Sequence, residues 1–169
     1  MLSSIDRVLI RINRRIVIAI LAAMAVMVFA NVALRFLTDQ SILWVEETSR
    51  YLMIWLTFLG AGIVLRYGGH VGIDTLQQRM PRHAAAIRTV IFVLLVVFFT
   101  VMVWLGARYS ALTWTQTTPV LQIPVGAVYL AMPIGFGLMM LHLLLMAVSY
   151  VRDGRFMADQ EFDADAVKL

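Results

Sequence analysis

The chain of 169 residues contains no cysteine, which excludes disulfide bonds, thiolate nucleophiles and zinc–sulfur sites. Charged residues are also scarce, at 14% of the chain, whereas 62% of the residues are hydrophobic. A soluble domain of this length could not bury so much apolar surface, because small domains leave a large share of their chain exposed to water. The alternation of polar and apolar residues that is typical of membrane-spanning strands is missing too. These absences indicate an all-α integral membrane protein.

Four long apolar runs remain once the charged segments are set aside. A bilayer core of about 30 Å requires about 20 apolar residues in a helix. The sequence therefore predicts membrane spans at about 16–37, 42–66, 86–108 and 125–150. The first run has a basic front but is long for a cleaved signal peptide, and we expect it to be a retained helix. Residues 1–152 are predicted to be a single four-helix membrane domain, followed by an acidic, disordered cytoplasmic tail at 153–169.

The distribution of lysine and arginine predicts the orientation of these spans. Eleven of the 14 basic residues precede the first span, lie between the second and third, or follow the fourth. Arg35, Arg50 and Arg108 are the three on the opposite side. The positive-inside rule then places both termini in the cytoplasm of a multi-pass protein of the bacterial inner membrane. Because the basic residues flank apolar runs, we expect membrane lipids as their partners, and no nucleic acid.

The first residues of the chain, 4–15, form an amphipathic pattern. Apolar residues share one helical face, and Arg7, Arg11 and Arg14 share another. This pattern predicts an N-terminal amphipathic helix that lies on the membrane surface. A plain extension of the first span is the alternative.

The stretch ILWVEETSRYLMIW places two carboxylates, Glu46 and Glu47, at the start of the second span. With Ser41 as a possible N-cap, both would lie at the positive end of a helix, and both could pair with Arg50 at helical spacing. Catalysis would need partner groups that the chain does not offer in a recognisable constellation, so no catalytic residue is assigned. An ion path would need charges running inward along the helix, where Gly60 and Gly62 instead favour close helix contact. We therefore expect an interfacial anchor.

The histidines allow a second interpretation. His70 and His142 are expected at similar depth, so that they could hold a b-type haem between them in a membrane anchor of a respiratory enzyme that also binds quinone. The simpler interpretation is that His142 forms a hydrogen bond to a neighbouring helix.

Four short runs between Asn31 and Leu76 resemble one family in their order. They are NVALRF, WVEETSRY, WLTFLGA and GHVGIDTL. Together they are similar to the DctQ-like small membrane subunit of TRAP transporters, the tripartite ATP-independent periplasmic transporters. The resemblance covers the first two spans and the segment after them most specifically.

This resemblance implies an accessory scaffold subunit, which is not an enzyme and has no cofactor or metal. Its partners would be a large TRAP membrane subunit, which carries the sodium and substrate sites, and a periplasmic substrate-binding protein. The complex would import organic acids such as C4-dicarboxylates or sialic acid with sodium. The candidate contacts to partner chains or lipid are Arg35, Trp44, Glu46, Glu47, Arg50, Trp55, Gly60 and His70.

Overall fold

The computed structural model describes residues 4–67 and 83–153, which are helical except for short connections. The helices are α1 (Ser4–Thr38), α2 (Leu43–Arg66), α4 (Ala84–Leu112), α5 (Val125–Tyr129), α6 (Ala131–Leu145) and α7 (Ala147–Asp153). Four helical stretches in these residues are long and apolar enough to cross a membrane: Val8–Thr38, Leu43–Arg66, Ala84–Leu112 and Val125–Leu145. The predicted fold of four membrane-spanning helices is confirmed. The acidic tail at 154–169 lies outside the described residues and stays a prediction.

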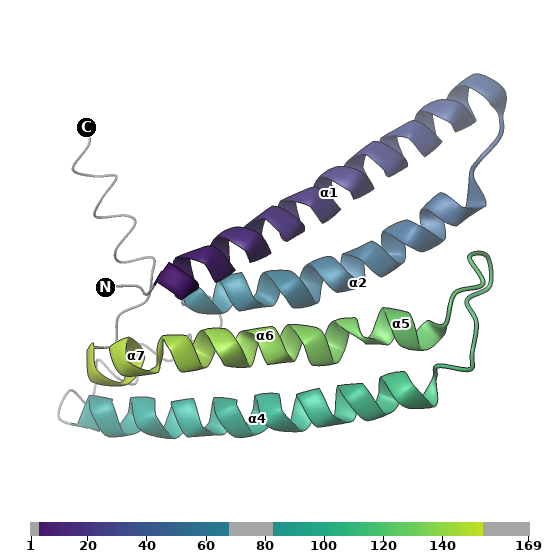
Figure 1. Ribbon diagram of the computed structural model, residues 1–169. Coiled ribbons are helices and arrows are strands. Elements are labelled where there is room, and N and C mark those ends of the chain that lie inside the picture. The colour runs from purple at the N-terminus through teal and green to yellow at the C-terminus, as the bar shows by residue number, and fades with distance from the viewer. Residues whose placement is uncertain (1–3, 68–82, 154–169) are drawn as a thin grey trace, which may run out of the picture.

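The helices lie side by side in the order α1, α2, α6 and α4 (Figure 1). The chain crosses the bundle in one direction along α2, in the opposite direction along α4, and in the first direction again along α5 and α6. The neighbours α2 and α6 are therefore parallel. One end of the bundle holds the start of α1, the end of α2, the start of α4, and α7. We call it the terminal end. The opposite end, with the turn at 39–42 and the loop at 113–124, is called the loop end.

The last span follows one path but is divided into α5, α6 and α7. The break between α5 and α6 has its cause in Pro133. Proline has no N–H to bond to the carbonyl group four residues earlier, and its ring crowds that carbonyl. The carbonyl belongs to Tyr129, which is the last residue of α5. The predicted span at 125–150 is thus interrupted at its proline, and the stretch that is long and apolar enough to cross a membrane runs from Val125 to Leu145.

The helices pack closely where a small residue faces a large one. A Cβ atom on Gly135 of α6 would lie 2.6 Å from the Cβ atom of Phe58 on α2, so that only glycine fits there. Phe136 packs edge-on against Phe58 and Phe98, with ring centroids 5.7 Å apart in both pairs. Toward the terminal end, the buried apolar core consists of Leu65, Phe99, Met139, Leu143, Met146 and Tyr150.

The prediction of a separate surface helix at 4–15 is wrong, because α1 continues without a break from Ser4 to Thr38. The segment contains no glycine or proline that would end the helix. Its buried residues, Ile10 and Asn13, pack toward the bundle, and Asn13 Nδ2 donates to the carbonyl oxygen of Leu59 at 3.1 Å. The extension of the first span was the correct alternative. At 35 residues, α1 is about 52 Å long, against a lipid core of about 30 Å.

Candidate functional site

The carboxylate of Glu47 is the centre of a polar cluster at the loop end. Its side chain is 1% exposed, although it belongs to the first turns of α2. Glu47 Oε2 accepts hydrogen bonds from the backbone N–H groups of Val120 and Leu121, at 2.8 and 3.0 Å. Glu47 Oε1 accepts the hydroxyl of Tyr51 at 2.7 Å. A buried carboxylate with three donors is stable in a dry environment and holds its donors in place.

The loop reaches Glu47 because residues 117–124 fold into a hairpin. Thr117 and Pro124 form a β-bridge, and the N–H of Thr118 donates to the carbonyl of Ile123 at 2.9 Å. The N–H of Ile123 donates back to the Thr118 hydroxyl at 3.2 Å, and Gln122 closes the tip with a φ of 54°. The backbone N–H groups of Val120 and Leu121, at the tip of the hairpin, are therefore free to donate to Glu47 on α2. The prolines signal an irregular segment, but nothing in the local sequence identifies its acceptor.

The predicted ion pairs with Arg50 are not formed. Glu46 and Arg50 are both exposed, and over the ranges 4–67 and 83–153 the structure contains no ion pair of Arg50 with either glutamate. The reason is geometric, since Glu47 points with Tyr51 toward the C-terminal half of the chain. Ser41 is not the N-cap either. Ile42 caps α2, and its N–H donates to the side-chain oxygen of Asn31 at 2.7 Å.

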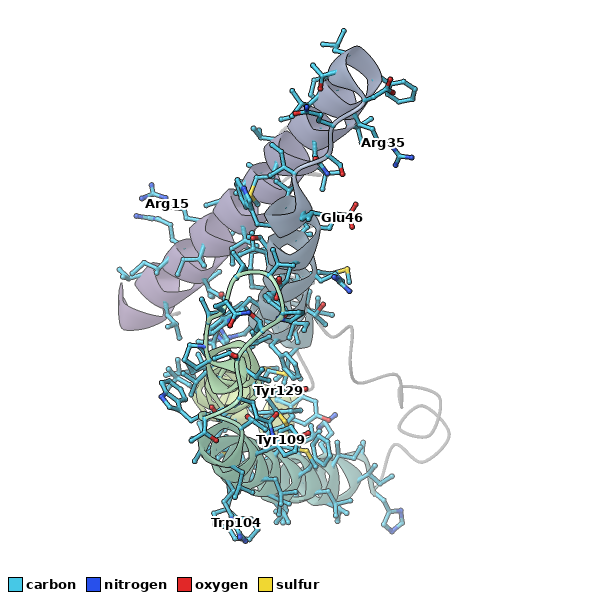
Figure 2. The ribbon with its side chains drawn as sticks, turned by 90° about the vertical axis from the view of Figure 1, so that its right-hand side faces the viewer. Arg15, Arg35, Glu46, Trp104, Tyr109 and Tyr129 are labelled. Atoms are coloured by element: carbon cyan, nitrogen blue, oxygen red, sulfur yellow. The ribbon has the colours of Figure 1, made fainter. Side chains whose placement is uncertain are left out.

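The remaining candidate residues do not gather in one place. Arg35 and Trp44 are exposed, and Trp55 is half-buried. Arg35 and Glu46 point to the same side of the molecule (Figure 2). Gly60 has open space where a Cβ atom would lie, so it makes no close helix contact. His70 falls outside the described residues.

Gly62, not Gly60, is the glycine at which two helices meet. A Cβ atom there would lie 2.9 Å from Cδ2 of His142. One turn further on, Arg66 Nε donates to His142 Nδ1 at 3.2 Å, and both side chains are buried. The prediction that His142 forms a hydrogen bond to a neighbouring helix is confirmed. The sequence analysis did not predict that the donor is a buried arginine. The signal that could have indicated it is Gly62, one turn before Arg66, because a glycine there leaves room for the imidazole ring beside the arginine.

Glu47 at the loop end and Arg66 at the terminal end thus both connect α2 to residues that follow α4. In the described ranges no group of three or more His, Asp or Glu side chains is placed to hold a metal ion. The arrangement fixes the helices against one another, and it resembles a structural support more than a reaction centre.

Comparison with known families is decisive for this interpretation. Residues 24–153 match the family described as tripartite ATP-independent periplasmic transporters, DctQ component. The chain belongs to the DctQ family. Members of this family are transporter subunits, so the prediction that the chain is not an enzyme is confirmed.

Three relatives show how far the similarity of this DctQ protein extends. A Haemophilus influenzae protein assigned as a TRAP transporter small permease protein is 34% identical over 68% of this chain and 71% of its own length. The C4-dicarboxylate TRAP transporter small permease protein of Rhodobacter capsulatus is 32% identical over 68% of this chain and 52% of its own. The ectoine TRAP transporter small permease protein of Halomonas elongata is 28% identical over 80% of this chain and 72% of its own. The chain thus spans about half of the Rhodobacter relative.

Family membership and the four apolar helices identify this DctQ component as a multi-pass protein of the bacterial inner membrane. The relatives named above are transporter subunits, which favours the transporter interpretation over a respiratory membrane anchor. The recognition of a TRAP small subunit from the runs between Asn31 and Leu76 is confirmed.

Proposed function

We propose that the chain is the small scaffold subunit of a sodium-coupled TRAP transporter that imports an organic acid. It would act with a large membrane subunit, in which sodium and solute bind, and with a periplasmic binding protein that delivers the solute. The observation that carries the proposal is the DctQ match over residues 24–153, because it covers the second, third and fourth spans and part of the first.

The distribution of charge within the chain supports a scaffold role. No Asp, Glu, Lys or Arg occurs between Arg15 and Arg35, between Arg50 and Arg66, or between Arg88 and Arg108. An organic anion crossing the membrane needs compensating charge along its path, because an ion at mid-membrane costs at least about 2.5 kcal/mol. A chain that keeps its charges at the two ends is poorly equipped to carry such a solute and well equipped to stay fixed in the bilayer.

The names of relatives suggest a range of solutes. They include C4-dicarboxylate, ectoine, isethionate and sialic acid systems. Each of these solutes carries a carboxylate or sulfonate group, so we infer a small organic anion or zwitterion for this system. We further infer from the positive-inside rule that the terminal end faces the cytoplasm and that the loop end, with Glu47 and the hairpin, faces the periplasm.

Reconstitution tests the proposal. Proteoliposomes that contain this chain and the large subunit, with binding protein added outside, should take up solute when an inward sodium gradient is imposed. Omission of any one of the three proteins, or of the gradient, should reduce uptake to background. Uptake by this chain alone would refute the scaffold role, and uptake that ignores sodium would refute the coupling.

A further inference from the structure

Three arginines lie close together on the exposed side of α1, near the terminal end. They are Arg11, Arg14 and Arg15, and we call them the arginine face. All three side chains are exposed, whereas Ile10 and Asn13 beside them are buried. Arg14 and Arg15 follow Arg11 by three and four positions, so both are its neighbours on the helix surface. In Figure 2 the side chain of Arg15 points away from the other helices, and the arginine face is open to the surroundings of the chain.

The arginine face has no anionic partner among the residues that the structure describes. None of its side chains forms an ion pair or a hydrogen bond with any of them. Asp6 is the only acidic residue before Asp39, and it precedes each of the three arginines by five positions or more. Ion pairs on a helix join residues three or four positions apart, and like charges at that spacing repel one another. An anion from outside the chain would therefore stabilise this part of α1.

The position of the arginine face along α1 matches that of a lipid head-group layer. The uncharged stretch from Ile16 to Leu34 has 19 residues and is about 28 Å long, close to the lipid core of about 30 Å. The arginine face directly precedes this stretch and extends about 6 Å along the helix axis. A head-group layer is about 5–8 Å thick on each side of the bilayer. The three guanidinium groups are thus at the level of lipid phosphates.

Exposed apolar side chains continue the arginine face into the lipid core. Ile18 follows Arg14 by four positions and Arg15 by three, and Leu21 follows Ile18 by three. Ile18 is 58% exposed and Leu21 is 54% exposed. One side of α1 therefore presents cations at the head-group level and an apolar surface directly below them. A phospholipid carries its phosphate and its acyl chains in the same order, whereas a free phosphate or an acidic peptide would leave the apolar surface uncovered.

The chemistry of arginine favours a phosphate over a neutral head group. A guanidinium group donates two parallel hydrogen bonds to phosphate oxygens, and basic residues near a membrane surface attract anionic lipids. The exposed arginines of the loop end provide a comparison within the chain. Arg35, Arg50 and Arg108 belong to α1, α2 and α4 respectively, so they do not form a group on one helix. The grouping is specific to the terminal end.

We propose that the arginine face, together with Ile18 and Leu21, is a binding site for an anionic phospholipid. The guanidinium groups donate to the phosphate oxygens of the lipid, which offsets the repulsion between the arginines, and an acyl chain covers the two apolar side chains. The main neighbour of α1 is α2 alone, so the bound lipid gives the terminal end of α1 a second contact. The site goes beyond the proposed function and does not depend on the solute or on a partner chain.

Native mass spectrometry of the full chain tests the preference for an anionic lipid. The chain, in a neutral detergent, is mixed with equal amounts of phosphatidylglycerol and phosphatidylethanolamine. We expect at least about tenfold more bound phosphatidylglycerol, because each arginine near the surface adds to its affinity. Equal binding of the two lipids would overturn the proposal.

Two variants with the same net charge locate the site. Arg11→Gln, Arg14→Gln and Arg15→Gln together should abolish the preference for phosphatidylglycerol. The control variant carries glutamine in place of the three exposed arginines of the loop end, Arg35, Arg50 and Arg108, and should retain it. Equal loss in both variants would mean that net charge alone attracts the lipid, and the proposal would fail.

Two further measurements distinguish the lipid from other anions. Glycerol phosphate, which has the head-group chemistry without acyl chains, should not displace phosphatidylglycerol at equal concentration. The acidic residues of the tail are the competing partner within the chain, and replacing them by amides leaves the full chain in place: Asp159→Asn, Glu161→Gln, Asp163→Asn and Asp165→Asn. This variant should bind phosphatidylglycerol as the natural chain does. Displacement by glycerol phosphate, or lipid binding only after the tail is neutralised, would overturn the proposal.

Photo-crosslinking of the natural chain gives a result that does not depend on how a variant folds. Phosphatidylglycerol with a diazirine near the start of its acyl chain is added to the full chain and activated by light. Fragmentation mass spectrometry should find adducts on Ile18 or Leu21 at least about fivefold more often than on Val93 or Leu94 of α4, which are similarly exposed and apolar. An even distribution of adducts over α1 and α4 would show that the lipid occupies no particular site.

Discussion

Each end of α2 contacts the C-terminal half of the chain through a buried charged side chain, and the two charges have opposite signs. At the loop end the buried anion of Glu47 accepts backbone N–H groups of a hairpin and the hydroxyl of Tyr51. At the terminal end the buried cation of Arg66 donates to His142. An anion near the start of a helix and a cation near its end both suit the helix dipole. The comparison shows that α2 is fixed to the C-terminal half of the chain at two points, with glycine-mediated packing between them.

The largest effect is expected at the loop end. Glu47→Leu removes the acceptor of three hydrogen bonds, two of them from partly buried backbone N–H groups, which should cost about 3 kcal/mol of unfolding free energy. Unfolding of the detergent-solubilised chain, followed by circular dichroism, measures the loss. Glu46→Leu is the matched control, because Glu46 is adjacent to Glu47 in the chain but is exposed and makes none of these hydrogen bonds. Equal losses in the two variants would contradict the structure.

The same variant can show whether the hairpin is released. The natural chain lacks cysteine, so Leu121→Cys introduces a single labelling site beside the N–H that donates to Glu47. Maleimide labelling of this site should be faster when Glu47→Leu is added and unchanged when Glu46→Leu is added. Unchanged labelling in both backgrounds would mean that the carboxylate does not hold the loop.

A smaller effect is expected at the terminal end, where Arg66→Met should cost about 2 kcal/mol of unfolding free energy. The double variant Arg66→Met with His142→Leu should recover part of this loss, since two apolar partners replace a polar pair. The same unfolding measurement applies, with Arg50→Met as the exposed control. A loss that exceeds that of Glu47→Leu would reverse the comparison between the two ends.

The packing between the two ends can be tested with two glycines of one helix. Gly135→Ala would bring a Cβ atom against Phe58 and should cost about 1–3 kcal/mol of unfolding free energy, as overpacked cores do. Gly137→Ala, two residues further on, should be neutral or slightly stabilising because its surroundings are open. Equal unfolding temperatures for the two variants would show that α6 and α2 are not in close contact.

The smallest effect is expected where α1 meets α2. Asn13→Leu removes one hydrogen bond to the carbonyl of Leu59, and such bonds between membrane helices contribute about 0.6 kcal/mol. Ile12→Leu, at the exposed neighbouring position, is the control. A loss above about 2 kcal/mol would mean that α1 is held as firmly as α6, which the structure does not indicate.

The sequence was sufficient for the parts of the fold that depend on local composition. Apolar runs are averages over about 20 residues, and they located all four spans. The contact of His142 with a neighbouring helix followed instead from the presence of a polar side chain inside an apolar span. The contact of Glu47 with the hairpin could not be predicted, because the two hairpin donors lie 73 and 74 residues away and are backbone groups with no side-chain signature. The local rule that pairs charges three or four residues apart selected Arg50 instead.

The glycines of α2 show a second limit. Gly60 and Gly62 are two positions apart, so they lie on different faces of the helix. Sequence alone gives both the same capacity for close contact and cannot say which face is already occupied. The structure separates them, with Gly62 against His142 and Gly60 open. The same limit explains why Glu46 and Glu47, adjacent and chemically alike, have different surroundings.

The length of α1 has a mechanical consequence. This helix exceeds the thickness of the hydrocarbon layer by about 20 Å, and its main neighbour is α2 alone. When a bilayer thins or thickens, α1 can change its inclination while α2, α6 and α4 keep their mutual packing. A change in the tilt of α1 would then accommodate a change in bilayer thickness, and the packing of the other three spans would stay the same.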